Sequence, residues 1–350
     1  GWTVGKGACS LVEIRSAEPA EESLIEELKG WEGVARVRTI APVNAVVANK
    51  ERKPPFHGAE EMLAYTEKNG RSLWQAAVDY ESALSGWSGR EVFEYARRLW
   101  RIIEASVEEG LKGGFDMNGI VTPRAGALLD QLTKKPRLPM GMLDLAVPVS
   151  LGVMEYSNAS GAIVCIPTGG SSGIVPGAIC GAAAHLGSDE DRKVEALLAA
   201  GIVGVCMGDG NNFMGGEFGC QAEVGCGAAM AAGALVQMLD GTPRQACDAA
   251  SMALQCLLGL VCDPVAGLVQ VPCLARNMGS TAVAVVSANA VMAGFDVAVP
   301  LQDMFEAMKT VGRIICKSHG IGTTTTPAGL RMKEEQAARD KALRRRGTCG

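Results

Sequence analysis

The sequence predicts a mainly α protein in which a large helical domain follows a small α+β segment. Three observations predict this fold: helical periodicity from residue 57 onward, a composition poor in aromatic residues, and a proline-containing break at residues 51–55. The 350 residues are 48% hydrophobic but only 5% aromatic, and 44 of them are glycine. Such a composition suits closely packed helices with small side chains and suffices for one large core or two modest ones.

The first 55 residues form the expected α+β segment. Residues 8–14 have the pattern of a strand, residues 21–29 that of a short helix, and residues 34–47 that of extended structure. Residues 51–55, Glu-Arg-Lys-Pro-Pro, are charged and then stiffened by proline, as in a linker. A segment this small cannot supply its own core, so we expect it to pack against another part of the protein or against a partner.

The helical domain is expected over residues 56–350. Residues 59–69, 73–84 and 89–109 carry apolar residues at three- and four-residue spacing between charged faces. Ser88, followed three residues later by Glu91, predicts a capping box at the start of the third helix.

Charge density falls between residues 140 and 315, where helical stretches alternate with glycine-rich breaks. This pattern is typical of buried helices around a site. Residues 281–299 are apolar but include Ser287, Asn289 and Asp296, which favours a buried helix over a transmembrane helix. Residues 333–346 predict a charged, exposed helix.

The net charge of −5 is mild and indicates neither a nucleic-acid partner nor an anionic membrane. The start of the chain lacks the pattern of a secretory signal, so we expect a cytoplasmic protein whose twelve cysteines are thiols or metal ligands rather than disulfides. Five cysteines in apolar runs are expected to fill core space as small hydrophobic residues: Cys165, Cys180, Cys206, Cys247 and Cys316.

Three loop segments have unusually specific compositions: residues 165–177 (CIPTGGSSGIVPG), 215–225 (GGEFGCQAEVG) and 258–273 (LGLVCDPVAGLVQVPC). The first presents consecutive backbone N–H groups and hydroxyls before an apolar helix, an arrangement that can hold a carboxylate or a phosphate. The candidate substrate-binding residues of this loop are Thr168, Gly169, Gly170, Ser171 and Ser172.

The second and third segments place Cys220, Cys262 and Cys273 beside glycine or proline, where the backbone can approach an inorganic cluster closely. The spacing lacks the paired C-x-x-C knuckles of a zinc ribbon. Thiolates from separated loops suit a cluster held in a folded cavity, although spacing alone does not decide the matter.

These motifs and their separation resemble the α domain of iron–sulfur-dependent L-serine dehydratases. The resemblance covers nearly the whole chain. Residues 55–109 are similar to the family's helical lead-in, residues 167–176 to its Pro-Thr-Gly-rich loop, and residues 323–329 to its Thr/Gly-rich closing motif. Residues 1–13 resemble the end of the family's β domain, which makes residues 1–55 a remnant of that domain.

The resemblance implies an oxygen-sensitive [4Fe–4S] cluster with Cys220, Cys262 and Cys273 as ligands and with the fourth iron open to substrate. That iron acts as a Lewis acid on a small hydroxy or amino acid, by default L-serine, which is converted to pyruvate and ammonia. In some relatives a C-terminal cysteine caps the open iron, and Cys349 is placed to do the same. The alternative is a tail thiol without this role.

The sequence departs from the family pattern at four places. Ser172 stands where the family usually has cysteine, Gln255-Cys256-Leu257 where it commonly has Glu-His-Asn, and Met214 where it has serine. The family's Ser-Ser-Ser-His-Thr motif, associated with substrate binding in the β domain, is missing. A separate chain then supplies the β portion, or the enzyme works without it. We also expect an oligomer.

The candidate acid–base groups follow from the loss of the family histidine. His57 and His185 are expected to be structural or superficial, whereas His319 lies beside the threonines at 323–326 and is the best catalytic candidate. Lys317 is a second candidate, as a base or as a carboxylate-binding cation.

Glu217 and Asp263 adjoin cluster cysteines and are expected to orient ligands or to bind the substrate amine, with helix capping as the alternative. Two other functions stay open. The same cluster could support cysteine desulfidation or an isomerisation, or the chain could be a non-catalytic subunit around a bound cluster.

Overall fold

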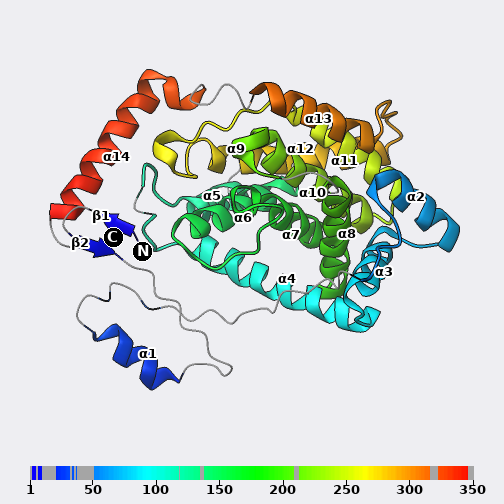
Figure 1. The fold of residues 1–350 in the computed structure, drawn as a ribbon, viewed down its shortest axis with the longest axis horizontal. Helices are drawn as coiled ribbons and strands as arrows, with labels where there is room; N and C mark the ends of the chain where they lie inside the picture. The colour runs from blue at the N-terminus through cyan, green and yellow to red at the C-terminus, as the bar shows by residue number, and fades with distance from the viewer. Residues whose placement is uncertain are drawn as a thin grey trace.

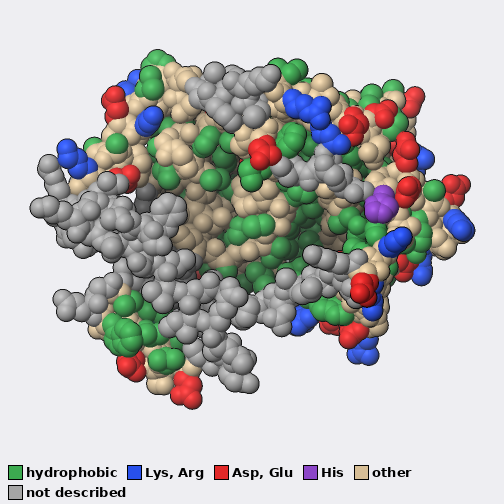
Figure 2. Space-filling model, viewed as in Figure 1, with side chains coloured by type: hydrophobic (Ala, Val, Ile, Leu, Met, Phe, Trp, Pro, Cys, Tyr) green, Lys and Arg blue, Asp and Glu red, His purple; other side chains and the backbone are tan. Residues whose placement is uncertain are grey.

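The computed structural model describes residues 2–4, 7–9, 21–31, 34, 37, 51–117, 119–134, 138–208, 213–315 and 322–345. Within these residues the chain is mainly helical (Figure 1), as the sequence predicts. Figure 2 shows the same face in space-filling form, with hydrophobic side chains in a central hollow and charged side chains mostly around its edge. The described residues include no helix long and apolar enough to cross a membrane.

The N-terminal part that the structure describes contains two short strands and a helix. Strands β1 (Trp2–Val4) and β2 (Gly7–Cys9) pair antiparallel, with Trp2 opposite Cys9. Helix α1 (Glu22–Lys29) begins one residue later than predicted, with Glu21 at its N-cap. Most of the strand predicted over residues 8–14, and most of the extended stretch predicted over 34–47, lie outside the described residues.

The three amphipathic helices predicted after residue 56 are present. They are α2 (Gly58–Asn69), α3 (Leu73–Ser85) and α4 (Gly89–Lys112), each within three residues of its predicted ends. The capping box at α4 is confirmed, because the Glu91 amide donates to Ser88 Oγ at 3.3 Å and the Ser88 amide donates to the Glu91 carboxylate at 2.8 Å.

The remaining α-helices complete the bundle. The loops between them carry the cysteine motifs. The helices are α5 (Ala125–Lys134), α6 (Leu143–Asn158), α7 (Ile174–Leu186), α8 (Glu190–Gly208), α9 (Gly215–Phe218), α10 (Cys226–Met238), α11 (Pro243–Leu257), α12 (Cys273–Met292), α13 (Leu301–Ile315) and α14 (Pro327–Arg345). Helix α14 begins six residues before the charged helix predicted from residue 333, because Pro327 suits the first turn of a helix.

Helix α10 forms the centre of the bundle. All thirteen of its residues are buried, and it packs against α7, α8, α11 and α12. Small residues allow the helices to approach closely, as at the crossing of α4 and α6, where a Cβ on Gly110 would lie 2.2 Å from the carbonyl oxygen of Gly152. The abundance of glycine and alanine in the sequence therefore reflects close helix packing.

The nine cysteines whose side chains the structure describes are free thiols, as expected. Cys206 and Cys247 are buried and Cys180 is partly buried, in agreement with the predicted core role. The prediction for Cys165 is wrong, because this residue is exposed in the irregular segment before the Thr168 loop rather than in a helix. Cys316 lies outside the described residues.

Candidate metal centre

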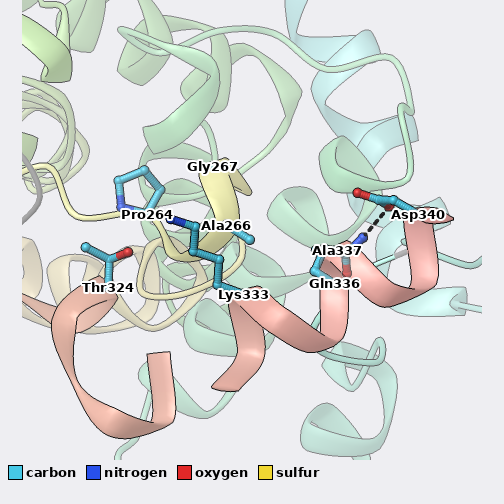
Figure 3. A pocket seen from close by; sticks show the side chains of 8 residues that line it. All are labelled: Pro264, Ala266, Gly267, Thr324, Lys333, Gln336, Ala337 and Asp340. Carbon is cyan, nitrogen blue, oxygen red and sulfur yellow. Dashed lines mark hydrogen bonds between the residues drawn. The ribbon is translucent and has the colours of Figure 1, made fainter. Parts of the chain in front are cut away.

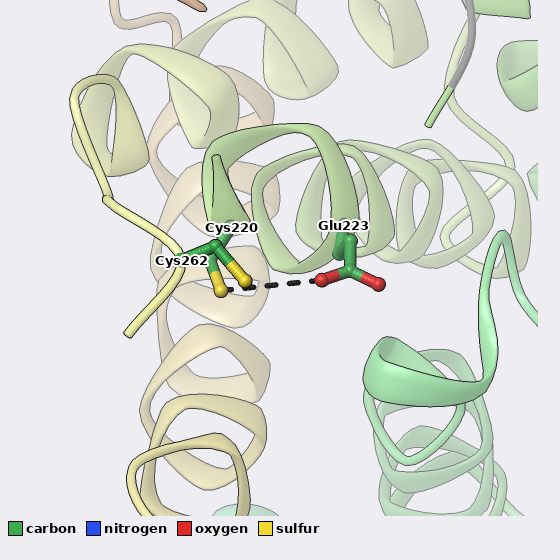
Figure 4. Close-up of side chains that lie close together, drawn as sticks. All are labelled: Cys220, Glu223 and Cys262. Carbon is green, nitrogen blue, oxygen red and sulfur yellow. Dashed lines mark hydrogen bonds between the residues drawn. The ribbon is translucent and has the colours of Figure 1, made fainter. Parts of the chain in front are cut away.

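Three separate segments bring the predicted cysteines together. Cys220 lies between α9 and the π-helix η2 (Gln221–Gly225), Cys262 lies in the loop after α11, and Cys273 is the first residue of α12. The Cys220 thiol lies close enough to the thiols of Cys262 and Cys273 for both to lower its pKa. The sulfurs of Cys220 and Cys262 and a carboxylate oxygen of Glu223 lie within 4.8 Å of one another (Figure 4).

The three thiols have different proton affinities. Hydrogen bonds from Cys262 and Cys273, together with the nearby Arg276 guanidinium, lower the pKa of Cys220 to about 3, although burial opposes the shift. The pKa values of Cys262 and Cys273 are raised, first because each is hydrogen-bonded to Cys220 and then because each is desolvated. The two neighbouring thiols and Arg276 thus favour the thiolate form of Cys220, the form that binds metals.

Gly219 allows the Cys220 segment to lie directly on the Cys262 loop. Its φ is +77°, and a Cβ at this position would lie 2.4 Å from the carbonyl oxygen of Leu260. Because a side chain would meet both backbone strain and this contact, glycine is needed beside Cys220. The π-helix that follows is an irregularity often found at functional sites.

Gln221 joins the two segments through a fully buried side chain. Its amide nitrogen donates to the carbonyl oxygens of Phe218 and Met308, both at 2.9 Å, and its amide oxygen accepts from the Gly259 amide at 2.8 Å. The backbone amide of Gln221 also donates to the Leu260 carbonyl at 3.2 Å. These bonds hold the Cys262 loop in register with Cys220.

A buried ion pair ties the Cys262 loop to α12. Arg276 lies three residues after Cys273, and its Nη2 is 2.8 Å from Asp263 Oδ1. Its Nη1 donates to the carbonyl oxygen of Val261 at 2.8 Å. Asp263 is only 2% exposed, and its second oxygen accepts from the Thr323 amide at 2.6 Å. The pair therefore connects α12, the Cys262 loop and the threonine-rich closing segment.

Glu223 is held in a narrow slot beside Cys220. Its Oε1 accepts a 2.8 Å hydrogen bond from Thr168 Oγ1, while its Oε2 lies 4.0 Å from Cys220 Sγ. Glycines form both walls of the slot, because a Cβ on Gly215 would lie 2.2 Å, and one on Gly170 3.1 Å, from the carboxylate. Burial raises the pKa of Glu223, the Thr168 hydrogen bond lowers it, and the negative charge of Cys220 raises it further.

The two serine hydroxyls of the Pro-Thr-Gly loop donate within the loop itself. Ser171 Oγ donates to the Ile166 carbonyl at 3.0 Å and Ser172 Oγ to the Thr168 carbonyl at 2.7 Å, and both serines are fully buried. Gly169 and Gly170 form a short 3₁₀ turn with Ser171 in front of α7. The two serine side chains thus stabilise the conformation of the loop. Its glycines are the positions at which a ligand can approach the backbone.

Asn277 connects this loop to the third cysteine. It is buried on α12, and its amide nitrogen donates to the carbonyl oxygens of Gly170 at 2.8 Å and of Cys273 at 2.9 Å. Its amide oxygen accepts from the Gly173 amide at 3.2 Å. The loop expected to hold a carboxylate is therefore fixed to the helix that begins with Cys273.

A cavity of about 360 Å³ lies behind the Cys262 loop (Figure 3). It is bounded by the turn that follows Asp263, by Thr324 and by α14; the lining residues are Pro264, Ala266, Gly267, Thr324, Lys333, Gln336, Ala337 and Asp340. Helix α14 thus covers the back of the loop that carries Cys262.

The predicted site residues separate into three groups. Those at the centre are the three cysteines, Asp263 and the loop of residues 168–172. Glu217 is exposed in the short α9, so the carboxylate beside the cysteines belongs to Glu223 instead. His319, Lys317 and Cys349 lie outside the described residues.

Sequence reasoning missed Glu223, Gln221, Arg276 and Asn277. A signal for two of them was available, because Arg276 and Asn277 follow Cys273 by three and four residues and therefore share its face of a helix. Among the departures from the family pattern, Ser172 is buried, Met214 is 57% exposed, and Gln255 and Cys256 are exposed at the end of α11.

The donor set fits an iron–sulfur group. Thiolates are the protein ligands of iron–sulfur clusters, and no histidine is within the group of donor atoms found among the described residues. The buried cation and the hydrogen-bonded carboxylate provide charged neighbours for such a group. The arrangement can therefore offer thiolates to such a group, with Glu223 and Thr168 beside them.

Comparison with known proteins finds relatives in one family. The family model described as "Serine dehydratase alpha chain" matches residues 61–323. The "Probable L-serine dehydratase, alpha chain" of Bacillus subtilis is 29% identical over 284 residues, which cover 80% of this chain and 95% of that protein. "L-serine dehydratase 1" of Escherichia coli is 38% identical over 237 residues, which cover 66% of this chain and 52% of that protein.

Relatives named as alpha chains align over nearly their whole length, whereas other relatives align over about half. The "Probable L-serine dehydratase, alpha chain" of Latilactobacillus sakei, 36% identical over 202 residues, is covered over 97% of its length, with 57% of this chain aligned. By contrast, the match covers only about half of the Escherichia coli protein.

Proposed function

This chain belongs to the serine dehydratase alpha chain family, and on that premise we propose that it is an iron–sulfur lyase that converts L-serine to pyruvate and ammonia. The observation that carries the proposal is that Cys220, Cys262 and Cys273, from three separate segments, lie close together. The names of the relatives, which include L-serine dehydratases, support the substrate.

We propose that Cys220, Cys262 and Cys273 hold a [4Fe–4S] cluster. When bound, the cluster supplies an iron that acts as a Lewis acid toward the hydroxyl that leaves. Cys349 is proposed to cap that iron in the absence of substrate.

The residues around the cysteines suggest how the substrate is held. Glu223 is proposed to bind the α-ammonium group, because Thr168 fixes one carboxylate oxygen and the other faces the cysteines. The N–H groups of Gly169 and Gly170 are proposed to hold the carboxylate at the N-terminal side of α7. Asp263 is proposed to orient the Cys262 loop through its pairing with Arg276.

Proton transfer is assigned to His319 and Lys317 as a proposal. The support for this assignment is their nearness in sequence to Thr323, whose backbone amide donates to Asp263 at 2.6 Å. The proton removed from the α-carbon would pass to one of these two side chains.

We further propose that residues 56–350 form the catalytic domain and residues 1–55 the end of a β domain. A separate chain is proposed to supply the remaining β portion, since nearly the whole of two relatives named as alpha chains aligns with this chain. Co-purification with a second chain, and the mass of the complex, test this assignment.

The test of function begins with anaerobic purification. We expect about four irons and four sulfides per chain, an EPR signal of the reduced protein that shifts when L-serine is added, and pyruvate formation from L-serine. Glu223→Gln is expected to keep its iron and to raise KM by about 10- to 100-fold, since a charged hydrogen bond is lost. Glu217→Gln, on the exposed α9, is the matched control and should leave KM unchanged.

A second function is favoured by the end of α11, where Gln255, Cys256 and Leu257 replace the family's acid and imidazole. The same cluster would then act on another substrate, such as L-cysteine. A panel of L-serine, L-threonine and L-cysteine separates the two functions. A complete cluster with no turnover and no EPR response to any of them would instead identify a non-catalytic subunit.

A further inference from the structure

Arg276 contacts all three segments that carry the cysteines. It belongs to α12, which begins with Cys273, and its two terminal nitrogens reach Val261 and Asp263 on either side of Cys262 in the sequence, both at 2.8 Å. Its guanidinium also lies near the Cys220 thiol.

The guanidinium is well suited to this position. It is planar and keeps its charge when buried, and it presents several N–H donors in fixed directions. The Arg276 side chain is 17% exposed and Asp263 is 2% exposed, so the pair is shielded from bulk water. In such surroundings a charge acts on its neighbours more strongly than at the surface.

We propose that Arg276 is a positioning residue that assembles the three-cysteine site before metal binds and raises the reduction potential of the bound cluster. The inference rests on the proposed cluster but goes beyond it, because it concerns a residue that is not a ligand. Removing a nearby cation makes the addition of an electron to the cluster less favourable, so the potential should fall.

The first part is tested without a cluster, by titrating the full apo chain with cobalt(II) anaerobically. Thiolate coordination of cobalt(II) gives charge-transfer absorption that counts sulfur ligands. Arg276→Met is expected to weaken cobalt binding at least about tenfold, because one of the links that hold the three segments together is lost. Arg276→Lys keeps the charge but loses the planar fork, so it should also bind cobalt more weakly than the unmodified chain.

The second part is tested by redox titration of the cluster, monitored by EPR. Arg276→Met is expected to shift the midpoint potential to a more negative value, whereas Arg276→Lys should keep it close to that of the unmodified protein. The two variants thus separate the contribution of the charge from that of the geometry.

Arg192 provides a matched control remote from the cysteines. It is 31% exposed, forms ion pairs with Glu195 and Asp240, and donates to the Met238 carbonyl at 3.2 Å. Arg192→Met therefore removes a similar set of contacts and should change neither cobalt affinity nor potential. Circular dichroism of each apo variant distinguishes unfolding from a local loss of the site.

The outcomes separate this inference from the proposed function. Unchanged cobalt affinity and unchanged potential in folded Arg276→Met, with a normal cluster in the unmodified protein, would overturn the role of Arg276 and leave the lyase proposal intact. Equal effects in Arg192→Met would also overturn it. An unmodified protein that contains neither iron nor sulfide would refute the proposed function itself.

Discussion

Cys220 and Cys226 are six residues apart and both are buried, at 3% and 0% exposure. Even so, the pKa values of their thiols are shifted in opposite directions. The pKa of Cys220 is lowered to about 3 by Cys262, Cys273 and Arg276. Burial alone raises the pKa of Cys226, whose sulfur lies 3.6 Å from the Met308 sulfur. Burial alone therefore does not decide the pKa of a thiol. The polar groups that can stabilise its charged form decide it.

The other core cysteines follow Cys226. Burial raises the pKa of Cys180 and of Cys247 to about 12, and the nearby Asp248 carboxylate adds to the shift of Cys247. These residues behave as small hydrophobic side chains, whereas Cys220, Cys262 and Cys273 are the proposed cluster ligands.

The largest difference between Cys220 and Cys226 is expected when each cysteine is replaced in turn. Cys220→Ala is expected to lose nearly all iron and sulfide and all lyase activity, since a cluster ligand is gone. Cys226→Ala should keep the cluster and lose about 1–2 kcal/mol of unfolding free energy through a small cavity. Iron and sulfide analysis and urea unfolding measure both effects. Loss of the cluster from Cys226→Ala would show that the two thiols are not functionally distinct.

The pH dependence of alkylation should separate the two thiols next. A lowered pKa means that Cys220 is already a thiolate at pH 5, so in the apo chain its rate with iodoacetamide should be nearly constant between pH 5 and pH 8. An ordinary thiol such as glutathione, added as an internal reference, should react about tenfold faster for each pH unit in this range. Cys226 should remain unlabelled throughout. Peptide mass spectrometry gives the rates, and a Cys220 rate that rises in parallel with glutathione would contradict the assigned thiolate.

A smaller effect is expected from Gln221, which fixes the segment of Cys220 to that of Cys262. Gln221→Leu removes the side-chain hydrogen-bond partner of the Gly259 amide and of the Phe218 and Met308 carbonyls. The variant should lose about 2–3 kcal/mol of unfolding free energy and part of its iron. Gln237→Leu is the matched control, because Gln237 is 5% exposed and accepts from the Trp74 amide far along the sequence from the cysteines. This control should keep its full iron content.

The smallest effect is expected at an exposed cysteine. Cys256→Ser, at the end of α11, should change the unfolding free energy by less than about 0.5 kcal/mol and leave the cluster in place, because it removes no buried contact. A loss of iron or of lyase activity in this variant would assign Cys256 to the site and extend the comparison to a third class of thiol.

Much of the fold could be predicted because it depends on local patterns. The helices over residues 58–112 follow from apolar residues at helical spacing, and the start of α4 follows from Ser88 and Glu91. Cys165 was predicted wrongly because the apolar residues around it suggest a core segment, whereas its exposure depends on how the Thr168 loop leaves the bundle. Local composition does not contain that information.

The site, like the fold, could be predicted only in part from the sequence. The three cysteines could be chosen from motifs, because each stands in a segment with unusual glycine and proline content. Glu217 was predicted because it adjoins Cys220, and Glu223 was missed although it also lies three residues from Cys220. The structure places Glu223 beside the sulfurs and leaves Glu217 exposed.

The sequence by itself determined a helical protein of small residues, the family to which it belongs and the three thiols of the centre. It did so because periodicity and motif order are properties of neighbouring residues. The tertiary structure decided which charged and amide side chains surround those thiols: Arg276, Asp263, Glu223 and Gln221. The physical reason is that hydrogen bonds and charge interactions depend on distances of a few ångströms between segments that lie up to about a hundred residues apart in the chain.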